Sequence, residues 1–159
     1  MSVKINLDNI AIVLQQPRYP ENIGSAARAA SNMGIGRLCV VNPENYDLAK
    51  IKKLATHAAT GVVDAIEKFP DLKTALAEYN YVVGTTARLG GQRPVLNSPE
   101  VMSRKIVPLS QKNRIAVVFG PEDRGLTNED LRLCHHLVHI PTAEFSSINL
   151  AQSVMIISY

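Results

Sequence analysis

A strand is expected to run into a helix across residues 139–152, HIPTAEFSSINLAQ, and this connection decides the fold. The apolar pair Leu137-Val138 just before it predicts a short strand, which Pro141 ends because proline has no N–H to give to a sheet. An apolar helix is predicted from about Ile148. A strand that leads through a polar loop into a helix N-terminus is a common ligand site. The alternative is an ordinary loop in which one of its two adjacent serines caps the helix.

Short apolar runs alternate with helical segments along the rest of the chain. Three runs lack polar alternation, as expected of strands buried on both faces: 10–14 (IAIVL), 37–41 (RLCVV) and 114–119 (RIAVVF). A further strand is predicted at 81–83, and helices at 23–33, 47–57, 71–79, from Ser98, at 127–134 and at 149–159. Asn22 is expected to cap the first helix, and Gly61 to break the second. This pattern predicts an α/β fold with a mostly parallel sheet and helices on both faces.

The composition is that of one globular domain over residues 1–159, with 46% hydrophobic and 19% charged residues. The net charge of +3 is spread along the chain, which permits a polyanionic partner without requiring one. Cys39 and Cys134 are expected to be buried free thiols in the cytoplasm, and we predict no metal site and no membrane partner. The last helix lacks closing signals, so we expect that a natural continuation is missing.

Three polar loops follow strands of the predicted sheet: 84–86 (GTT), 120–122 (GPE) and 140–142 (IPT). Because parallel strands end at the same edge of a sheet, these loops predict a ligand site there. In the second loop, Glu122 and Arg124 could orient a substrate or brace each other. In the third, serine hydroxyls, the amide of Asn149 and free helix N–H groups suit an uncharged or carboxylate-bearing ligand.

The helix at 23–33 presents Arg28 on a face of small residues that includes Gly24 and Ser25. Such a surface lets a phosphate approach, and the guanidinium can bind it at two points. A solvated surface arginine is the alternative. Histidines 135 and 136 are expected to end a helix, where a cation is favoured. The chain has no P-loop, no Gly-x-Ser-x-Gly nucleophile motif and no dinucleotide fingerprint after its first strand.

Taken together, these segments resemble the SpoU branch of the SPOUT RNA methyltransferases. The resemblance rests on three motifs in order, 22–28 (NIGSAAR), 119–126 (FGPEDRGL) and 140–151 (IPTAEFSSINLA), and covers nearly the whole chain. The chain is most similar to the bacterial tRNA 2′-O-methyltransferases that act on cytidine or uridine in the anticodon loop. The resemblance implies an α/β-knot fold with a C-terminal trefoil knot, a homodimer, tRNA as substrate and S-adenosyl-L-methionine as cofactor.

The resemblance also implies roles for individual residues. Arg28 is the expected catalytic group, positioned with the ribose by Asn22, Glu122, Ser147 and Asn149, and it would face the cofactor of the other subunit. Arginine is a poor base because its pKa lies above about 12, so we hypothesise that it binds the adjacent phosphate and stabilises the developing alkoxide. The cofactor is expected to contact Thr85, Thr86, Ala87, Gly120, Ile140, Ser146, Ser147, Ile148 and Leu150.

Two other functions fit the same residues. One is a non-catalytic RNA-binding dimer on the same fold, and the other is an α/β enzyme with a different nucleotide ligand. Tight binding of S-adenosyl-L-methionine without a metal would favour the transferase, whereas no binding would favour the scaffold. The intact Arg28, Glu122 and Asn149 favour an active enzyme.

Overall fold

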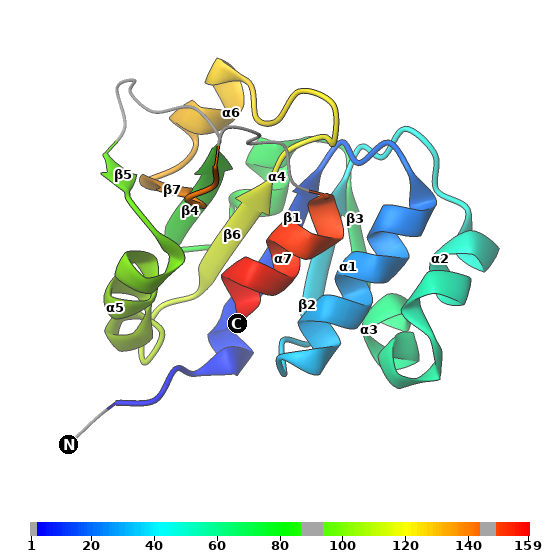
Figure 1. The fold of residues 1–159 in the computed structure, drawn as a ribbon, viewed down its shortest axis with the longest axis horizontal. Helices are drawn as coiled ribbons and strands as arrows, with labels where there is room; N and C mark the ends of the chain where they lie inside the picture. Colours follow the sequence, from blue (N-terminus) through cyan, green and yellow to red (C-terminus); the bar gives the residue numbers. More distant parts are fainter. Residues whose placement is uncertain (1–2, 87–93, 144–148) are drawn as a thin grey trace.

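A computed structural model describes residues 3–86, 94–143 and 149–159 of the chain. In this part, seven strands form one sheet in the order β3-β2-β1-β6-β4-β7-β5 (Figure 1), and every neighbouring pair is parallel. The predicted parallel sheet is therefore confirmed. The strands are β1 (Ile10–Gln15), β2 (Arg37–Val41), β3 (Glu67–Phe69), β4 (Tyr81–Thr86), β5 (Val95–Leu96), β6 (Ile115–Phe119) and β7 (His136–His139).

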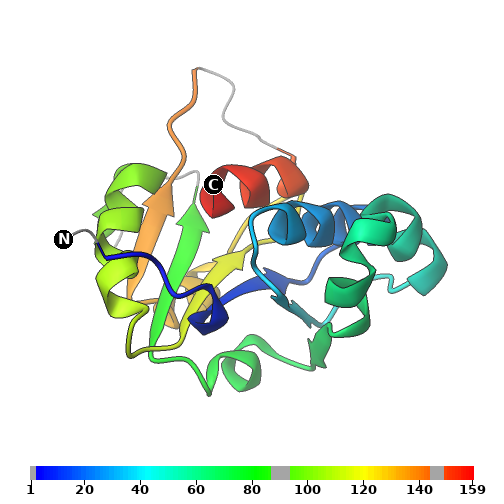
Figure 2. The ribbon, with the colours of Figure 1, turned by 90° about the horizontal axis from the view of Figure 1, so that it is seen from below.

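Helices cover both faces of the sheet, as predicted (Figure 2). One face is covered by α1 (Pro20–Asn32), α5 (Pro99–Leu109) and α7 (Leu150–Ser158), and α2 (Leu48–Ala55) and α3 (Thr60–Asp64) pack against α1. The other face carries α4 (Leu72–Leu76) and α6 (Asn128–Arg132), and two short 3₁₀ helices are η1 (Leu7–Asn9) and η2 (His57–Ala59). None of the helices in the described ranges is long and apolar enough to cross a lipid bilayer.

The central strand β1 is buried on both faces, as its uninterrupted apolar run predicts. Ile10, Ile12 and Leu14 pack into the layer under α1, α5 and α7, whereas Val13 packs into the layer with α4 and α6. Since all strands run the same way, the carboxyl ends of β1, β6, β4 and β7 lie along one edge of the sheet. This edge is where the polar loops of the sequence motifs begin.

The first helix begins earlier than the sequence predicts. It starts at Pro20, with Tyr19 as an N-cap that makes no side-chain hydrogen bond. Proline is favoured at the first helical position because the N–H there has no partner in the helix. The expected capping role of Asn22 is wrong: this residue lies in the first turn, and its amide bonds to Glu122 instead.

Two other predicted boundaries are also wrong. The second helix ends at Ala55, because the next residue, Thr56, has a φ of 64° that takes the backbone out of the helix, and Gly61 lies inside α3. Strand β4 continues to Thr86 because Thr85 and Thr86 pair with Val138 and His139 of β7. The segment 84–86 is therefore the end of a strand and not a loop, although it still lies at the carboxyl edge.

The histidine pair does not end a helix. His136 opens β7, and its Nδ1 lies 2.7 Å from the hydroxyl of Tyr81. The Nδ1 of His135 accepts a hydrogen bond from the backbone N–H of Val82 at 3.0 Å. The imidazole rings of both histidines thus help to join β7 and the residue before it to β4. The trefoil knot stays a prediction, because residues 144–148 and 87–93 lie outside the described part of the chain.

Candidate functional site

The carboxyl edge of the sheet brings the three sequence motifs together. β1 and β6 are neighbours, with Leu14 opposite Phe119, so the loops that follow them lie side by side. β4 pairs with both β6 and β7, which places Thr85, Thr86 and Ile140 further along the same edge. Segments far apart in the sequence therefore form one site.

Glu122 joins the middle motif to the start of α1. Its Oε1 accepts a hydrogen bond from the backbone N–H of Arg18 at 2.8 Å. Its Oε2 accepts from the backbone N–H of Tyr19 at 3.2 Å and from the amide of Asn22 at 2.8 Å. Hydrogen bonds to a carboxylate are stronger than those between neutral groups. Asn22 and Glu122 are thus in contact, and together they fix the N-terminus of the helix that carries Arg28.

Arg28 lies on the exposed face of α1, nearly two turns after Asn22. No ion pair engages its guanidinium within the described ranges 3–86, 94–143 and 149–159. Ser25, one turn earlier, leaves its surroundings uncrowded. The guanidinium is therefore available for a phosphate or another anionic ligand.

Gly24 does not belong to that exposed face, contrary to the prediction. It is buried beneath α2, and a Cβ added there would lie 3.0 Å from the Cβ of Leu54 and would clash with the carbonyl oxygen of Ile51. Its lack of a side chain lets α1 and α2 pack backbone to backbone. The glycine of the first motif thus serves helix packing.

The loop from Gly120 to Gly125 is folded tightly on itself. The N–H of Gly125 donates to the carbonyl of Pro121 at 2.9 Å, and its φ of +71° favours glycine. A Cβ on Gly120 would lie 2.7 Å from the Cα of Gly125. Gly120 is therefore required by the turn itself. Within this loop Arg124 does not brace Glu122, since its guanidinium donates to the Oε1 of Gln16 at 3.0 Å.

The expected cofactor residues of the sheet lie at the end of β4 and after β7. The hydroxyl of Thr85 donates to the carbonyl of Val118 at 3.0 Å, which fixes its rotamer. Thr86 and Ile140 are half-buried at the same edge. The described residues of these two segments, GTT and HIPTA, carry no lysine, arginine or carboxylate. Hydroxyls, backbone groups and an apolar side chain suit an uncharged nucleoside better than a phosphate.

Asn149 caps α7. Its side-chain oxygen accepts hydrogen bonds from the backbone N–H groups of Ala151 at 2.9 Å and Gln152 at 3.3 Å. The alternative in which a serine caps this helix is therefore wrong. The side chain of Leu150 is buried in the core, which leaves its backbone as the part that a ligand could reach. The expectations for Ala87, Ser146, Ser147 and Ile148 fall on residues outside the described ranges.

Sequence reasoning missed a buried polar pair beneath this edge. Gln15, at the end of β1, donates from its amide to the Oδ1 of Asp130 at 3.1 Å, and both residues are buried. The Oδ2 of Asp130 accepts from the backbone N–H of Thr127 at 3.0 Å, which completes a capping box on α6. The sequence signal for this pair was Gln15, a polar residue at the end of an otherwise apolar strand.

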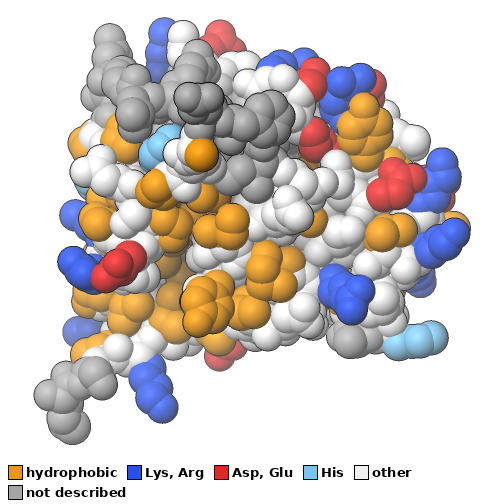
Figure 3. All heavy atoms as spheres, in the orientation of Figure 1, with side chains coloured by type: hydrophobic (Ala, Val, Ile, Leu, Met, Phe, Trp, Pro, Cys, Tyr) orange, Lys and Arg blue, Asp and Glu red, His pale blue; other side chains and the backbone are white. Residues whose placement is uncertain are grey.

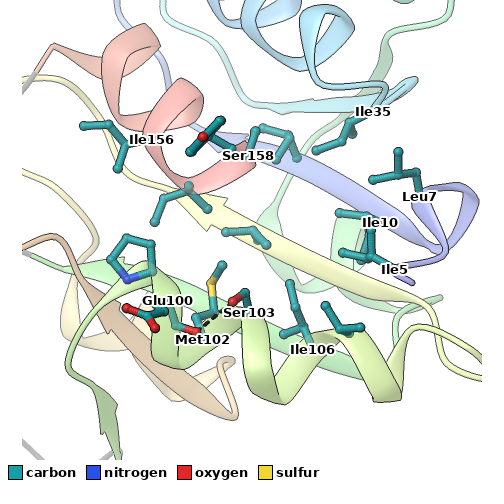
Figure 4. Close-up of a pocket in the computed structure, with 16 residues that line it drawn as sticks. Ile5, Leu7, Ile10, Ile35, Glu100, Met102, Ser103, Ile106, Ile156 and Ser158 are labelled. Carbon is teal, nitrogen blue, oxygen red and sulfur yellow. Dashed lines mark hydrogen bonds between the residues drawn. The ribbon is translucent and has the colours of Figure 1, made fainter. Parts of the chain in front are cut away.

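An apolar cavity lies elsewhere on the molecule. Figure 3 shows hydrophobic side chains gathered between α5 and α7, and Figure 4 shows Ile10, Met102 and Ile156 around the cavity there, which has a volume of about 380 Å³. Glu100 is the one charged residue among the described residues that line it, and no motif residue does. Apart from Glu100, Ser103, Ser158 and Tyr159, the described side chains that line this cavity are apolar, so the carboxyl edge remains the candidate site.

The described ranges contain no group of three or more His, Cys, Asp and Glu side chains that could hold a metal ion. The fold and the site thus define a parallel α/β protein with polar groups at the carboxyl edge of its sheet and, on α1, an exposed arginine without an ion pair in the described ranges. Residues 9–159 match the model of the SpoU rRNA Methylase family, and the chain belongs to this family. The resemblance inferred from the three motifs is confirmed at this level.

Individual relatives agree with this assignment. The chain is 40% identical over 157 residues to the tRNA (cytidine/uridine/adenosine-2′-O-)-methyltransferase TrmJ of Pseudomonas aeruginosa, covering 96% of this chain and 60% of that protein. A probable methylase family protein from Haemophilus influenzae Rd KW20 matches with a TM-score of 0.89 and 38% identity, over 97% of this chain and 65% of that one. TrmJ from Z. mobilis ZM4 matches with a TM-score of 0.86 and 36% identity, over 94% of this chain and 66% of that one. The chain spans less than two thirds of the length of these relatives.

Proposed function

We propose that this chain is an S-adenosyl-L-methionine-dependent tRNA methyltransferase that methylates the ribose 2′-oxygen of a cytidine or uridine. Family membership and the named TrmJ relatives support the reaction and its substrate. The observation that carries the proposal is Arg28, exposed and without an ion-pair partner in the described ranges, on a helix whose start is fixed by Glu122. A tRNA substrate also favours action in the cytoplasm.

The residues at the carboxyl edge fit the proposed cofactor. When bound, S-adenosyl-L-methionine supplies a methyl group that is activated by its attachment to a cationic sulfur. Thr85 and Thr86 offer a fixed hydroxyl and backbone groups, and Ile140 offers an apolar surface for a base. The missing positive charge on these segments suits a cationic ligand. It disfavours the rival in which the site binds a nucleotide phosphate.

Arg28 would act on the ribose and its neighbouring phosphate. The bound cofactor would supply the methyl group to the ribose 2′-oxygen, whose proton would pass to the phosphate or to water. The guanidinium would bind the phosphate at two points and stabilise negative charge on the attacking oxygen. Glu122 and Asn22 would contribute by fixing α1, and hence the position of Arg28, before the substrate arrives. In the proposed homodimer, Arg28 faces the cofactor of the partner.

Substitution of Arg28 tests this function. Calorimetry should detect metal-free binding of S-adenosyl-L-methionine to both the natural chain and Arg28→Ala, whereas methyl transfer to tRNA should be lost in the variant. Arg28→Lys should recover only part of the rate, since lysine keeps the charge without the two-point geometry. Arg104→Ala is the matched control, because Arg104 is an exposed arginine on α5 that pairs with Glu100. Near-normal turnover by Arg28→Ala, or no cofactor binding by the natural chain, would refute the proposal.

A further inference from the structure

The outer face of α2 carries three exposed lysines, 50, 52 and 53. The Nζ of Lys52 lies 3.6 Å from Asp64 of α3, whereas Lys50 and Lys53 form no ion pair within the described part of the chain. Figure 3 shows basic side chains gathered at the edge of the molecule over α2. Two positive charges on this helix are therefore left for a partner.

Nearby carboxylates are engaged elsewhere. Asp47 caps α2 by accepting the backbone N–H of Lys50 at 3.3 Å. Glu44 pairs with Arg18 at 3.2 Å. Glu21, in the first turn of α1, is the remaining acid of this region that forms no ion pair in the described ranges. Within the described ranges, none of these carboxylates forms an ion pair with Lys50 or Lys53.

The lysines lie on the helix that packs against α1, which carries Arg28. The two helices touch where Gly24 meets Leu54. Arg28 lies one helical turn after Gly24, Lys50 lies one turn before Leu54, and Lys53 is next to Leu54 in the chain. All three basic residues thus lie within about one turn, a rise of roughly 5.4 Å, of the helix contact. We call these three residues the basic flank.

We infer that the basic flank binds the phosphate backbone of the RNA, with Lys50 and Lys53 holding the strand whose ribose reaches Arg28. This inference rests on the proposed function. RNA is favoured over an acidic protein because the flank includes Arg28, the residue proposed to bind a substrate phosphate. Lysines bind phosphates as point charges, so these two residues supply affinity and register without reading the bases. Sequence specificity must then come from other contacts.

The double variant Lys50→Gln/Lys53→Gln tests the flank against the control Lys73→Gln/Lys112→Gln. The control lysines are exposed and lie on α4 and after α5. Affinity for tRNA is measured at increasing salt concentration, and S-adenosyl-L-methionine binding verifies that each variant is folded. Each lost contact should lower the slope of log affinity against log salt by about 0.7 for a single strand. The double variant should therefore lose about 1.4 in slope and bind roughly twenty-fold more weakly at 0.1 M salt, with a matching rise in KM.

Separate outcomes overturn the flank and the function. The flank is overturned if the double variant has the same salt slope of tRNA affinity and the same KM as the natural chain, whatever its methylation rate. It is also overturned if the control variant loses as much salt slope and affinity as the double variant. A natural chain that binds tRNA through the flank but transfers no methyl group overturns the proposed function and leaves the flank standing. Failure of the natural chain to bind tRNA overturns both.

Discussion

Replacing Gly24 by alanine should destabilise the protein, although alanine is the better helix former. The new Cβ would lie 3.0 Å from both the carbonyl carbon of Ile51 and the Cβ of Leu54, and closer still to the carbonyl oxygen of Ile51. The contacts on Ile51 are backbone, so α2 itself must move. Alanine gains about 1 kcal/mol in helix propensity, whereas overpacking against backbone should cost about 2–3 kcal/mol, the upper part of the usual range. We expect the free energy of unfolding to fall by about 1–2 kcal/mol.

Urea unfolding measures this change, and Gly61→Ala is its control. At about 2 kcal/mol per molar urea, the midpoint of Gly24→Ala should fall by roughly 0.5–1 M. A Cβ on Gly61 meets nothing within 4 Å, and this residue is exposed within α3. Gly61→Ala should therefore raise stability by about 0.4–1 kcal/mol. If Gly24→Ala were as stable as Gly61→Ala, the close packing of α1 on α2, and with it the basic flank, would be refuted.

Three further variants or conditions probe other parts of the structure. Glu122→Gln should lower the unfolding free energy by about 1–3 kcal/mol in urea titrations, because an amide cannot accept all three hydrogen bonds. The same variant should slow methyl transfer. Unchanged stability and an unchanged rate would contradict the role of Glu122 in fixing the start of α1. Burial, with a neighbouring lysine and histidine, lowers the pKa of His136 below its ordinary 6.5, so the unfolded state binds the extra proton first and stability should fall as pH drops below about 6.5. His136→Gln should make the free energy of unfolding less dependent on pH in this range. An equally steep fall with decreasing pH in the variant would contradict the role of His136. Burial raises the pKa of Cys39 to about 11, and Cys134 is also buried, so a thiol reagent at pH 8 should react with both only after unfolding; rapid reaction of the native protein would contradict this.

The sequence predicts the sheet well because the burial of a central strand is indicated by the apolar residues of the strand itself. Residues 10–14 and 115–119 are apolar without interruption, and both become neighbouring strands buried on two faces. The residue at which a strand ends is harder to predict from the sequence. Gly84, Thr85 and Thr86 have the composition of a turn, yet they form the end of β4 because β7 supplies their partners from more than fifty residues away. No local pattern contains that information.

Helix ends show the same limit in a different form. Ser98 and Thr127 cap their helices as predicted, since a side-chain cap depends on residues two or three positions away. Asn22 has the same chemistry, but Pro20 starts the helix before it and Glu122 takes its amide. A polar residue near a helix start therefore predicts a cap reliably only where no distant carboxylate competes for it.

The same distinction separates the motif residues by role. Gly24, Gly120 and Asn149 were expected to touch or approach a ligand, but their immediate physical roles are helix packing, a tight turn and a helix cap. Glu122 accepts hydrogen bonds from two backbone N–H groups of the loop that leads into α1 and from the amide of Asn22 in its first turn. Arg28 differs from all of these because no ion pair in the described ranges uses its charge. These packing contacts and hydrogen bonds fix the helix that carries one exposed guanidinium, as a preorganised phosphate-binding site requires. The loss of Arg28 should therefore affect the chemistry more than the fold.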